Sequence, residues 1–434
     1  MKAQIINVRR NSDSLFLGKI PSLAAPLIAR ILKDKKIDVE IIDENQGQVT
    51  PEDLRGSDIV LLTSYTHNAS RAYSIAKQVE DNPIIIMGGP HATFLPEEAL
   101  SNGVDIVVRG LADQTLPDLI DALVNSNPLN EVAGISYKDL EDIRHNPDRE
   151  ISPVDDMPIP YFGAISNLRK PYRRYPLQLS RGCSHRCDFC QIHRSIPIQQ
   201  IKGVDRVAQD IDQIEEDYSN GLFQEIAGKK RVLLVDDNFG SKETREKTMI
   251  LLEHIIERGL NFRLTTQARI EFGFDDELLN LFYLAGGRRV LLGIESLGDE
   301  QLKEMEKGTT RKKILDSLDR IKRYGFEVWG LFIVGYDHDT QKSILNIPEY
   351  ANEIDLDCSN VTILTPFPGT KVYDRMITQN RIDVLDWSRY DGYHCVFKPN
   401  QIKRPELERI VRSIMKDDPS SIYNYMRSSN GISN

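Results

Sequence analysis

The chain has 434 residues, enough for two or three domains that each bury a core. It carries 55 Lys and Arg against 65 Asp and Glu, a formal net charge of −10, which argues against a general nucleic-acid-binding protein with a basic face. No stretch approaches the ~18 uninterrupted apolar residues of a membrane-spanning helix, and the N-terminal segment lacks the apolar core of a signal peptide. We therefore expect a cytoplasmic protein with neither nucleic acid nor membrane as a partner.

Apolar runs alternate with helical periodicity over roughly the first 150 residues. Short apolar runs typical of buried strands occur at 4–8, 38–42, 59–63, 84–87 and 105–108. Helical patterns lie between them at 21–33, 69–79 and 116–124. This alternation predicts an α/β domain over residues 1–150, with a parallel sheet covered by helices on both faces and a short hairpin from Gly134 onward.

The segment 151–161 has three prolines and no periodicity, so we expect a linker over 151–170. Strand candidates then follow at 177–180, 232–235, 262–265, 290–293, 328–334 and 360–364. Helical patterns separate them at 204–218, 244–258, 276–284, 311–324 and 341–353. Six βα units in series predict a partial (β/α)6 barrel over 171–385, with chemistry at the carboxyl ends of its strands. A C-terminal extension, 386–434, would hold one amphipathic helix at 405–415 and a frayed end at 428–434.

Three of the five cysteines are crowded into one short segment. Cys183, Cys187 and Cys190 form the pattern Cys-x3-Cys-x2-Cys just after the first barrel strand. In a cytosolic chain such crowding predicts a metal site. Three thiolates on one loop could hold an iron–sulfur cluster that keeps one iron open for a substrate or cofactor. The alternative is tetrahedral zinc, with His185 or His193 as the fourth ligand.

The triplet, with Phe189 before its last cysteine, resembles the signature of radical S-adenosylmethionine (SAM) enzymes. The resemblance continues through the barrel to about residue 400. It implies a [4Fe-4S] cluster on the three cysteines, whose open iron is chelated by SAM. Electron transfer then cleaves SAM to methionine and a 5′-deoxyadenosyl radical, which abstracts a hydrogen atom from the substrate. An electron donor such as flavodoxin or ferredoxin is implied as a partner.

The resemblance also implies SAM contacts after the second and third barrel strands. Asp236, Asp237 and Asn238 fall where the family holds the methionine amine, and carboxylates suit an ammonium group. Asn238 could also cap the following helix. Gln267 and Arg269 follow the third strand, where Arg269 would pair with the methionine carboxylate or merely with the neighbouring Glu271.

Two further strand ends complete the implied SAM site. Glu295 ends the fourth strand and resembles the ribose-contacting position of the family. Ile333 and Gly335 belong to a strand that resembles the adenine-packing strand, where glycine allows close approach of the backbone.

The sequences GGPHAT at 88–93 and Val108-Arg109-Gly110 resemble the cobalamin-binding domain that precedes many radical SAM enzymes. The resemblance covers about residues 1–140 and implies a Rossmann-like, doubly wound sheet. The family's Asp-x-His-x-x-Gly pattern is Asp43-Glu-Asn45-Gln-Gly47 here, without the histidine, and its acidic Gly-Glu-Gly-Glu turn is replaced by 110–113. Since such a domain can persist as a scaffold, we regard cobalamin as possible but not favoured. Lone histidines such as His67 and His91 are expected to be structural.

The remaining cysteines lead to the main functional hypothesis. Cys358 is expected to be a buried, inert thiol, and the same reading is the alternative for Cys395. A thiol can nevertheless donate a hydrogen atom to a carbon radical, and a donor opposite the adenosyl radical would produce epimerisation. The late cysteine, the missing histidine and the layout resemble the radical SAM peptide epimerases of proteusin-type pathways. We therefore expect epimerisation of L- to D-residues in a ribosomally made precursor peptide, with Cys395 as catalytic hydrogen-atom donor facing the barrel cavity.

Three other functions remain open. The first is a cobalamin-dependent radical SAM methyltransferase acting at an unactivated carbon or phosphorus. The second is another radical rearrangement or cyclisation, and the third is a non-catalytic iron–sulfur protein.

Overall fold

The computed structural model describes residues 1–9, 20–140 and 142–424. These residues fall into two compact units, one formed by 1–9, 20–173 and 208–224, the other by 174–207 and 225–424. The frayed end expected at 428–434 lies outside the described residues. Of the helices described, none combines the length and the apolar character needed to cross a membrane.

The first unit contains the expected parallel sheet and hairpin. Its strands are β1 (Lys2–Asn7), β2 (Asp38–Asp43), β3 (Ile59–Thr63), β4 (Ile84–Gly88), β5 (Ile106–Val108), β6 (Ile135–Asp139) and β7 (Asp142–His145). They lie in the order β2-β1-β3-β4-β5-β6-β7, and the first five are parallel. The chain passes from β1 to β2 on one side and then crosses to β3 on the other side of β1, so the carboxyl ends of β1 and β3 form the topological switch point of a doubly wound sheet.

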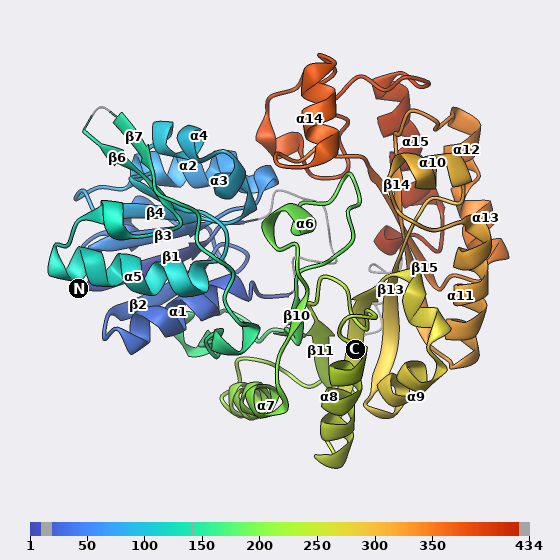
Figure 1. The fold of residues 1–434 in the computed structure, drawn as a ribbon, viewed down its shortest axis with the longest axis horizontal. Coiled ribbons are helices and arrows are strands. Elements are labelled where there is room, and N and C mark those ends of the chain that lie inside the picture. Colours follow the sequence, from blue (N-terminus) through green and yellow to red (C-terminus); the bar gives the residue numbers. More distant parts are fainter. Residues whose placement is uncertain (10–19, 141, 425–434) are drawn as a thin grey trace. The chain divides into compact units, whose positions relative to one another are not determined.

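Helices cover both faces of this sheet, as Figure 1 shows, and strands in its middle such as β3 and β4 are mostly apolar. One face carries α1 (Ala24–Asp34) and α5 (Ala112–Asn125), and the other carries α2 (Ala69–Gln78), α3 (Pro90–Phe94) and α4 (Pro96–Ser101). Ala25, Ala29 and Leu32 on α1 pack into the core that includes Ile5 and Leu61.

The predicted linker at 151–170 is part of the first unit. The backbone N–H of Ser166 donates to the carbonyl of Ile41 at 3.0 Å, and the Asn167 side chain donates to the carbonyl of Asp43 at 3.0 Å. The segment therefore runs along the edge of β2, and the prolines before it do not make a free connection.

The second unit has the six-stranded sheet expected of a partial barrel. Its strands are β8 (Tyr175–Leu177), β11 (Lys230–Leu234), β12 (Phe262–Ala268), β13 (Gly287–Glu295), β14 (Glu327–Val334) and β15 (Cys358–Ile363). They are all parallel and pair in serial order, β8 to β15. Their carboxyl ends therefore meet at one edge, which is where side chains for chemistry gather in this architecture.

Helices flank this sheet and follow the predicted periodicity, with a few differences. They are α6 (Ile192–Ser195), α8 (Arg245–Glu257), α9 (Asp276–Leu284), α10 (Asp299–Glu304), α11 (Arg311–Arg323), α12 (Gln341–Leu345), α13 (Ile347–Glu353), α14 (Lys371–Thr378) and α15 (Arg404–Asp417). The single helix predicted at 341–353 is two, because Pro348 lacks an N–H and suits only the first turn of a helix. Helix α7 (Val204–Ser219), predicted within the barrel, belongs mostly to the first unit.

A two-stranded antiparallel pair, β9 (Ser180–Arg181) with β10 (Gln200–Ile201), was not predicted. The first barrel strand also ends earlier than expected, at Leu177, and Ser180 belongs to β9 instead. This pair brackets the segment that carries the three cysteines.

Candidate cofactor site

The cysteine loop begins with a residue that has to be glycine. Gly182 has φ +89°, and a Cβ there would lie 2.3 Å from the carbonyl oxygen of Ile198. This close approach folds the loop back on itself, with Cys183 and Cys187 buried and Cys190 partly buried. Burial raises the pKa of the Cys190 thiol to about 11.

The donor set of this loop fits a cluster better than a single ion. In the described part of the chain, no group of three or more His, Cys, Asp or Glu side chains could hold one metal ion. The zinc alternative stays a prediction that needs His185 or His193 as a fourth ligand, because tetrahedral zinc draws four ligands around one point. The cysteines of a [4Fe-4S] cluster bind different irons and can stand further apart. Cys358 and Cys395 are buried elsewhere, so three thiols fit a cluster with one open iron.

Asp188, between the second and third cysteines, anchors the loop to distant segments. Its carboxylate accepts a hydrogen bond from the Tyr336 hydroxyl at 2.6 Å and one from Arg375 at 3.0 Å. Its backbone N–H donates to the carbonyl of Met305, and its own carbonyl accepts from the N–H of Val372. Asp188 was not predicted, although an acidic residue inside a metal-binding pattern is a signal that could have pointed to it.

The two carboxylates after β11 serve the backbone at the entrance to the loop. Asp236 is buried, and its Oδ1 accepts from the N–H groups of Leu179 and Ser180 at 2.8 and 3.0 Å. Burial raises the pKa of Asp236 to about 7. The Oδ2 atom of Asp237 accepts from the N–H of Gly182 at 2.7 Å. The role of Asp236 as a contact for the methionine amine stays a prediction, and in this structure its Oδ1 serves the backbone of Leu179 and Ser180.

Asn238 and Gln267 remain predictions as SAM contacts. Asn238 is buried, and its carbonyl accepts from the side chain of Gln199 at 2.6 Å. The following helix begins at Arg245, so the alternative in which Asn238 caps it is wrong. Gln267, near the end of β12, keeps an exposed side chain that is available to a ligand.

Arg269 lies against the cysteine loop. Its Nη1 donates to Sγ of Cys187 at 3.3 Å, its Nη2 donates to the carbonyl of Lys307, and its Nε lies 3.3 Å from the carboxylate of Glu271. The alternative of pairing with Glu271 is therefore observed. The contact with the thiol was not foreseen.

Glu295 ends β13 in an unusual conformation. Its φ is +63°, in the left-handed region, and the ladder with β14 shifts register between Gly293 and Glu295. Its Oε1 accepts from Nζ of Lys307 at 2.7 Å, and both residues are buried. Non-glycine residues in this region carry strain that often marks functional sites.

Gly293 provides the space for this ion pair. A Cβ at position 293 would lie 2.8 Å from Oε1 of Glu295 and 2.9 Å from Nζ of Lys307. Because the Lys307 carbonyl also holds Arg269, hydrogen bonds run from Cys187 through Arg269 and Lys307 to Glu295. Lys307 escaped prediction because the segment KEMEKGTTRKK has the composition of a solvated surface.

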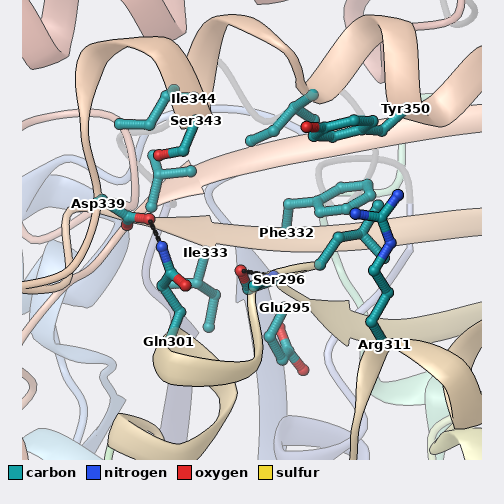
Figure 2. A pocket seen from close by; sticks show the side chains of 14 residues that line it. Glu295, Ser296, Gln301, Arg311, Phe332, Ile333, Asp339, Ser343, Ile344 and Tyr350 are labelled. Atoms are coloured by element: carbon teal, nitrogen blue, oxygen red, sulfur yellow. Dashed lines mark hydrogen bonds between the residues drawn. The ribbon is translucent and has the colours of Figure 1, made fainter.

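A cavity of about 180 Å³ lies at the carboxyl ends of β13 and β14 (Figure 2). Glu295 and Ile333 of the predicted SAM contacts line it. The lining also includes residues that were not predicted, namely Ser296, Gln301, Arg311, Phe332, Asp339, Ser343 and Tyr350.

Asp339 shapes the turn beside this cavity. Its Oδ2 accepts from the backbone N–H groups of Gly335 and Tyr336 at 2.7 and 3.0 Å, and Gln301 donates to its Oδ1. Gly335, with φ +104°, thus lies in a tight turn next to the cavity, outside its lining.

Cys395 is not among the residues that line the cavity at the carboxyl ends of β13 and β14. The residue is fully buried, its Sγ donates to the carbonyl of Phe397 at 3.3 Å, and burial raises its pKa to about 11. The predicted placement of Cys395 as a hydrogen-atom donor is therefore wrong. Cys358 packs among Leu291, Trp329 and Ile422, so the expectation of a buried thiol is confirmed there.

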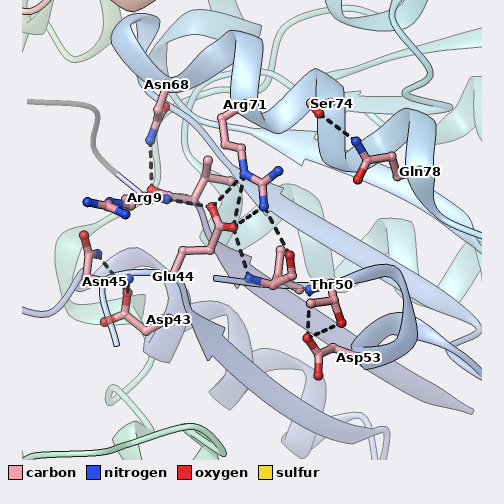
Figure 3. A network of polar contacts seen from close by, with 12 residues as sticks. Arg9, Asp43, Glu44, Asn45, Thr50, Asp53, Asn68, Arg71, Ser74 and Gln78 are labelled. Carbon is pink, nitrogen blue, oxygen red and sulfur yellow. Dashed lines mark hydrogen bonds and ion pairs between the residues drawn. The ribbon is translucent and has the colours of Figure 1, made fainter. Parts of the chain in front are cut away.

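In the first unit, Asn45 stands where the family pattern has histidine. Its side chain is exposed and donates to Oδ1 of Asp43 at 2.8 Å, while the Tyr172 hydroxyl donates to Oδ2 of Asp43 at 2.6 Å. Beside it, buried Glu44 pairs with Arg71 at 2.6 Å (Figure 3). Fully buried His91 contacts the Tyr73 hydroxyl at 3.0 Å, which confirms a structural histidine.

Comparison with known families assigns both units. The sequence model of the radical SAM superfamily matches residues 177–351, and that of the B12 binding domain matches residues 15–120. This chain combines a B12-binding domain with a radical SAM domain. The first match includes the cysteine loop and the barrel strands as far as β14, so the family expected from the triplet is confirmed.

Curated relatives of this B12-binding radical SAM protein include methyltransferases. It is 28% identical to an uncharacterized methyltransferase of Pyrococcus horikoshii, over 90% of this chain and 86% of that protein. It is 26% identical to the bacteriochlorophyllide d C-12(1)-methyltransferase of Chlorobaculum tepidum, over 88% of this chain and 79% of that protein.

Two solved structures share the fold. The cobalamin-dependent SAM radical enzyme OxsB, with aqua-cobalamin and SAM bound, matches with a TM-score of 0.73 and 18% identity over 94% of this chain. This chain covers 65% of OxsB, so about a third of OxsB has no counterpart here. The radical SAM methyltransferase TsrM from Kitasatospora setae, with cobalamin and a [4Fe-4S] cluster, matches with a TM-score of 0.73 and 15% identity over 97% of this chain and 91% of TsrM.

These comparisons overturn two expectations. The named relatives are methyltransferases, so peptide epimerisation and its precursor-peptide substrate are not supported. The match to the B12-binding domain also counts against the expectation, drawn from the missing histidine, that cobalamin is not favoured.

Proposed function

We propose that the protein is a cobalamin-dependent radical SAM methyltransferase that methylates an unactivated carbon or phosphorus atom. The observation that carries this proposal is the joint presence, in one chain, of a three-cysteine loop on a radical SAM domain and a B12-binding domain. The similarity to methyltransferases over about nine-tenths of the chain supports it.

Cys183, Cys187 and Cys190 would hold the cluster, and the chain prepares their positions. Asp237 fixes the backbone of Gly182 at the loop entrance, and Asp188 ties the last turn of the loop to Tyr336 and Arg375. When bound, the cluster supplies one electron to SAM. A low-potential donor such as flavodoxin or ferredoxin would provide that electron.

SAM would be held at the carboxyl ends of the barrel strands. Glu295 lies at the cavity, and the hydrogen bonds through Lys307 and Arg269 connect it to Cys187. A cavity of about 180 Å³ is smaller than the roughly 300 Å³ of a typical small-ligand site, so we assign it to one part of the cofactor. The carboxylate of Glu295 suits sugar hydroxyls as donors.

Cobalamin would occupy the carboxyl edge of the first unit, where one buried polar atom is unsatisfied. The hydroxyl of Thr66, just after β3, is buried and has no hydrogen-bond partner among the described residues. It lies at the switch point between β1 and β3, which Asn68 spans by donating to the carbonyl of Val8 at 3.0 Å. Such an atom and position fit a ligand at this edge. When bound, cobalamin carries the methyl group.

The test is anaerobic incubation of the reconstituted protein with cobalamin, a reductant and SAM carrying a trideuterated methyl group. Small-molecule extracts serve as the substrate pool, and the variant lacking all three loop cysteines serves as control. Cobalamin retained by the protein, formation of S-adenosylhomocysteine and 5′-deoxyadenosine, and a product carrying the labelled methyl group support the proposal. A cyclised or rearranged product without label would refute methyl transfer.

A further inference from the structure

The guanidinium of Arg269 is held by two hydrogen bonds and one ion pair within the radical SAM domain. Its Nη1–H points at Sγ of Cys187 at 3.3 Å, its Nη2–H is held by the carbonyl of Lys307, and its Nε lies 3.3 Å from the carboxylate of Glu271. The residue is buried, whereas the Glu271 side chain is 47% exposed. A planar guanidinium held in this way cannot turn toward another anion without breaking one of these contacts.

We propose that Arg269 sets the reduction potential of the cluster through its N–H···S bond to Cys187, and does not bind the methionine carboxylate. The inference rests on the proposed function, because it needs the [4Fe-4S] cluster on the three cysteines. It assigns to Arg269 a role different from the one that the family resemblance implied.

The sign of the effect follows from charge. Reduction is a one-electron step, [4Fe-4S]²⁺ + e⁻ → [4Fe-4S]⁺, with titanium(III) citrate as the reductant in the test and a flavodoxin or ferredoxin in the cell. The added negative charge spreads onto the cluster and its thiolate ligands. A buried cation beside one of these sulfurs stabilises the reduced form more than the oxidised form, because the interior screens charges weakly. Hydrogen bonds to cluster sulfurs are known determinants of potential.

Replacing Glu271 should shift the midpoint potential of the cluster in the opposite direction. Its carboxylate partly offsets the Arg269 charge, and its exposed side chain makes replacement compatible with folding. Arg269→Gln should therefore lower the midpoint potential, whereas Glu271→Gln should raise it. Arg269→Lys keeps the positive charge but loses the planar guanidinium with its rigidly arranged N–H donors. Its midpoint potential should therefore fall between those of wild type and Arg269→Gln.

The experiment is a redox titration of the reconstituted full-length protein, followed by electron paramagnetic resonance of the reduced cluster. Arg323→Gln is the matched control, since Arg323 forms an exposed pair with Asp319, and its midpoint should equal that of wild type. A downward shift in Arg269→Gln together with an upward shift in Glu271→Gln supports the inference. An unchanged midpoint in Arg269→Gln overturns it.

Two further outcomes are decided by iron and sulfide analysis. If Arg269→Gln does not retain a cluster, the midpoint potential of Glu271→Gln becomes the test. An unchanged or lowered midpoint in Glu271→Gln overturns the inference. If wild type itself assembles no [4Fe-4S] cluster, the proposed function fails, and the inference fails with it. A cluster of wild-type potential in Arg269→Gln leaves the proposed function intact.

Discussion

The ammonium nitrogen of Lys307 lies 2.7 Å from Oε1 of Glu295, and both residues are buried at the carboxyl edge of the barrel sheet. Removing one partner of a buried ion pair leaves an uncompensated charge, at a cost of about 3–5 kcal/mol. Lys307→Met should therefore destabilise the protein by that order, and adding Glu295→Gln should recover part of the loss. Denaturant unfolding of wild type and of these two variants measures this.

The exposed pair between Lys312 and Asp316 is the control for that experiment. Lys312→Met should change the free energy of unfolding by less than about 0.5 kcal/mol, because exposed ion pairs contribute little. If Lys307→Met and Lys312→Met lowered the free energy of unfolding equally, the buried pair would contribute no more to stability than the exposed one.

Gly293→Ala should disturb the same pair without touching either charge. Its new Cβ would lie 2.8 and 2.9 Å from the Glu295 and Lys307 side chains, closer than van der Waals contact allows. We expect a destabilisation of about 1–3 kcal/mol and weaker binding of SAM, measured by calorimetry. Gly88→Ala in the first unit serves as the control for SAM binding, because a Cβ at that position would make only ordinary van der Waals contact, 3.7 Å from the carbonyl oxygen of Val108. If Gly293→Ala bound SAM with wild-type affinity, the ion pair between Glu295 and Lys307 would not contribute to the SAM site.

Replacing any one of Cys183, Cys187 or Cys190 by Ala should abolish both the cluster and the reductive cleavage of SAM. Three ligands on one loop leave no spare thiol, since the other cysteines, Cys358 and Cys395, are fully buried elsewhere. Iron analysis and the yield of 5′-deoxyadenosine are the readouts. Retention of SAM cleavage in a single variant would mean that another side chain completes the cluster site.

Cys395→Ala should retain the cluster, SAM cleavage and methyl transfer, with a stability loss of about 1 kcal/mol. The thiol is fully buried and donates to the carbonyl of Phe397, so it has no route to a substrate radical. Cys358→Ala is the matched buried control and should behave in the same way. Loss of activity in Cys395→Ala alone, at normal cluster content, would restore a chemical role for this thiol.

Asp236 should make the stability of the protein depend on pH. Burial raises its folded-state pKa to about 7, above the ordinary value of 3.8. Between these values the folded state binds a proton that the unfolded state does not, so the free energy of unfolding falls as pH rises toward 7. Asp236→Asn should flatten this dependence, as measured by the thermal midpoint of both proteins from about pH 5 to pH 8. A wild-type midpoint that rises relative to the variant over this range would show the opposite sign.

Much of the fold follows from the sequence because parallel strands buried on both faces carry uninterrupted apolar runs. Strands such as β3 and β14 could be located in this way, and so could helix α9. Shorter elements could not be found, since the two-residue strands β9 and β10 are held by tertiary pairing and not by their own residues. The packing of 164–167 against β2 likewise depends on contacts that composition does not reveal.

The site was predictable where spacing alone decides the chemistry, as with the three cysteines. It was not predictable where a side chain can either face a ligand or bind another group of the protein. Asp236 was expected to face a ligand but binds the backbone of Leu179, and Arg269 was expected to bind a carboxylate but lies against a thiol. Lys307 was missed because a charged segment between two helices gives no sign that one of its lysines is buried.

The contacts of Asp188 have a consequence for the order of biosynthesis. The cysteine loop is complete in the chain by residue 190, yet its last turn is secured by Met305, Tyr336, Val372 and Arg375, which are translated much later. While the ribosome is still making the barrel, the three thiols lie on a loop without its supports and are open to oxidation. We therefore expect iron–sulfur delivery to follow completion of the barrel, and oxygen exposure during synthesis should damage the protein more than the same exposure after completion.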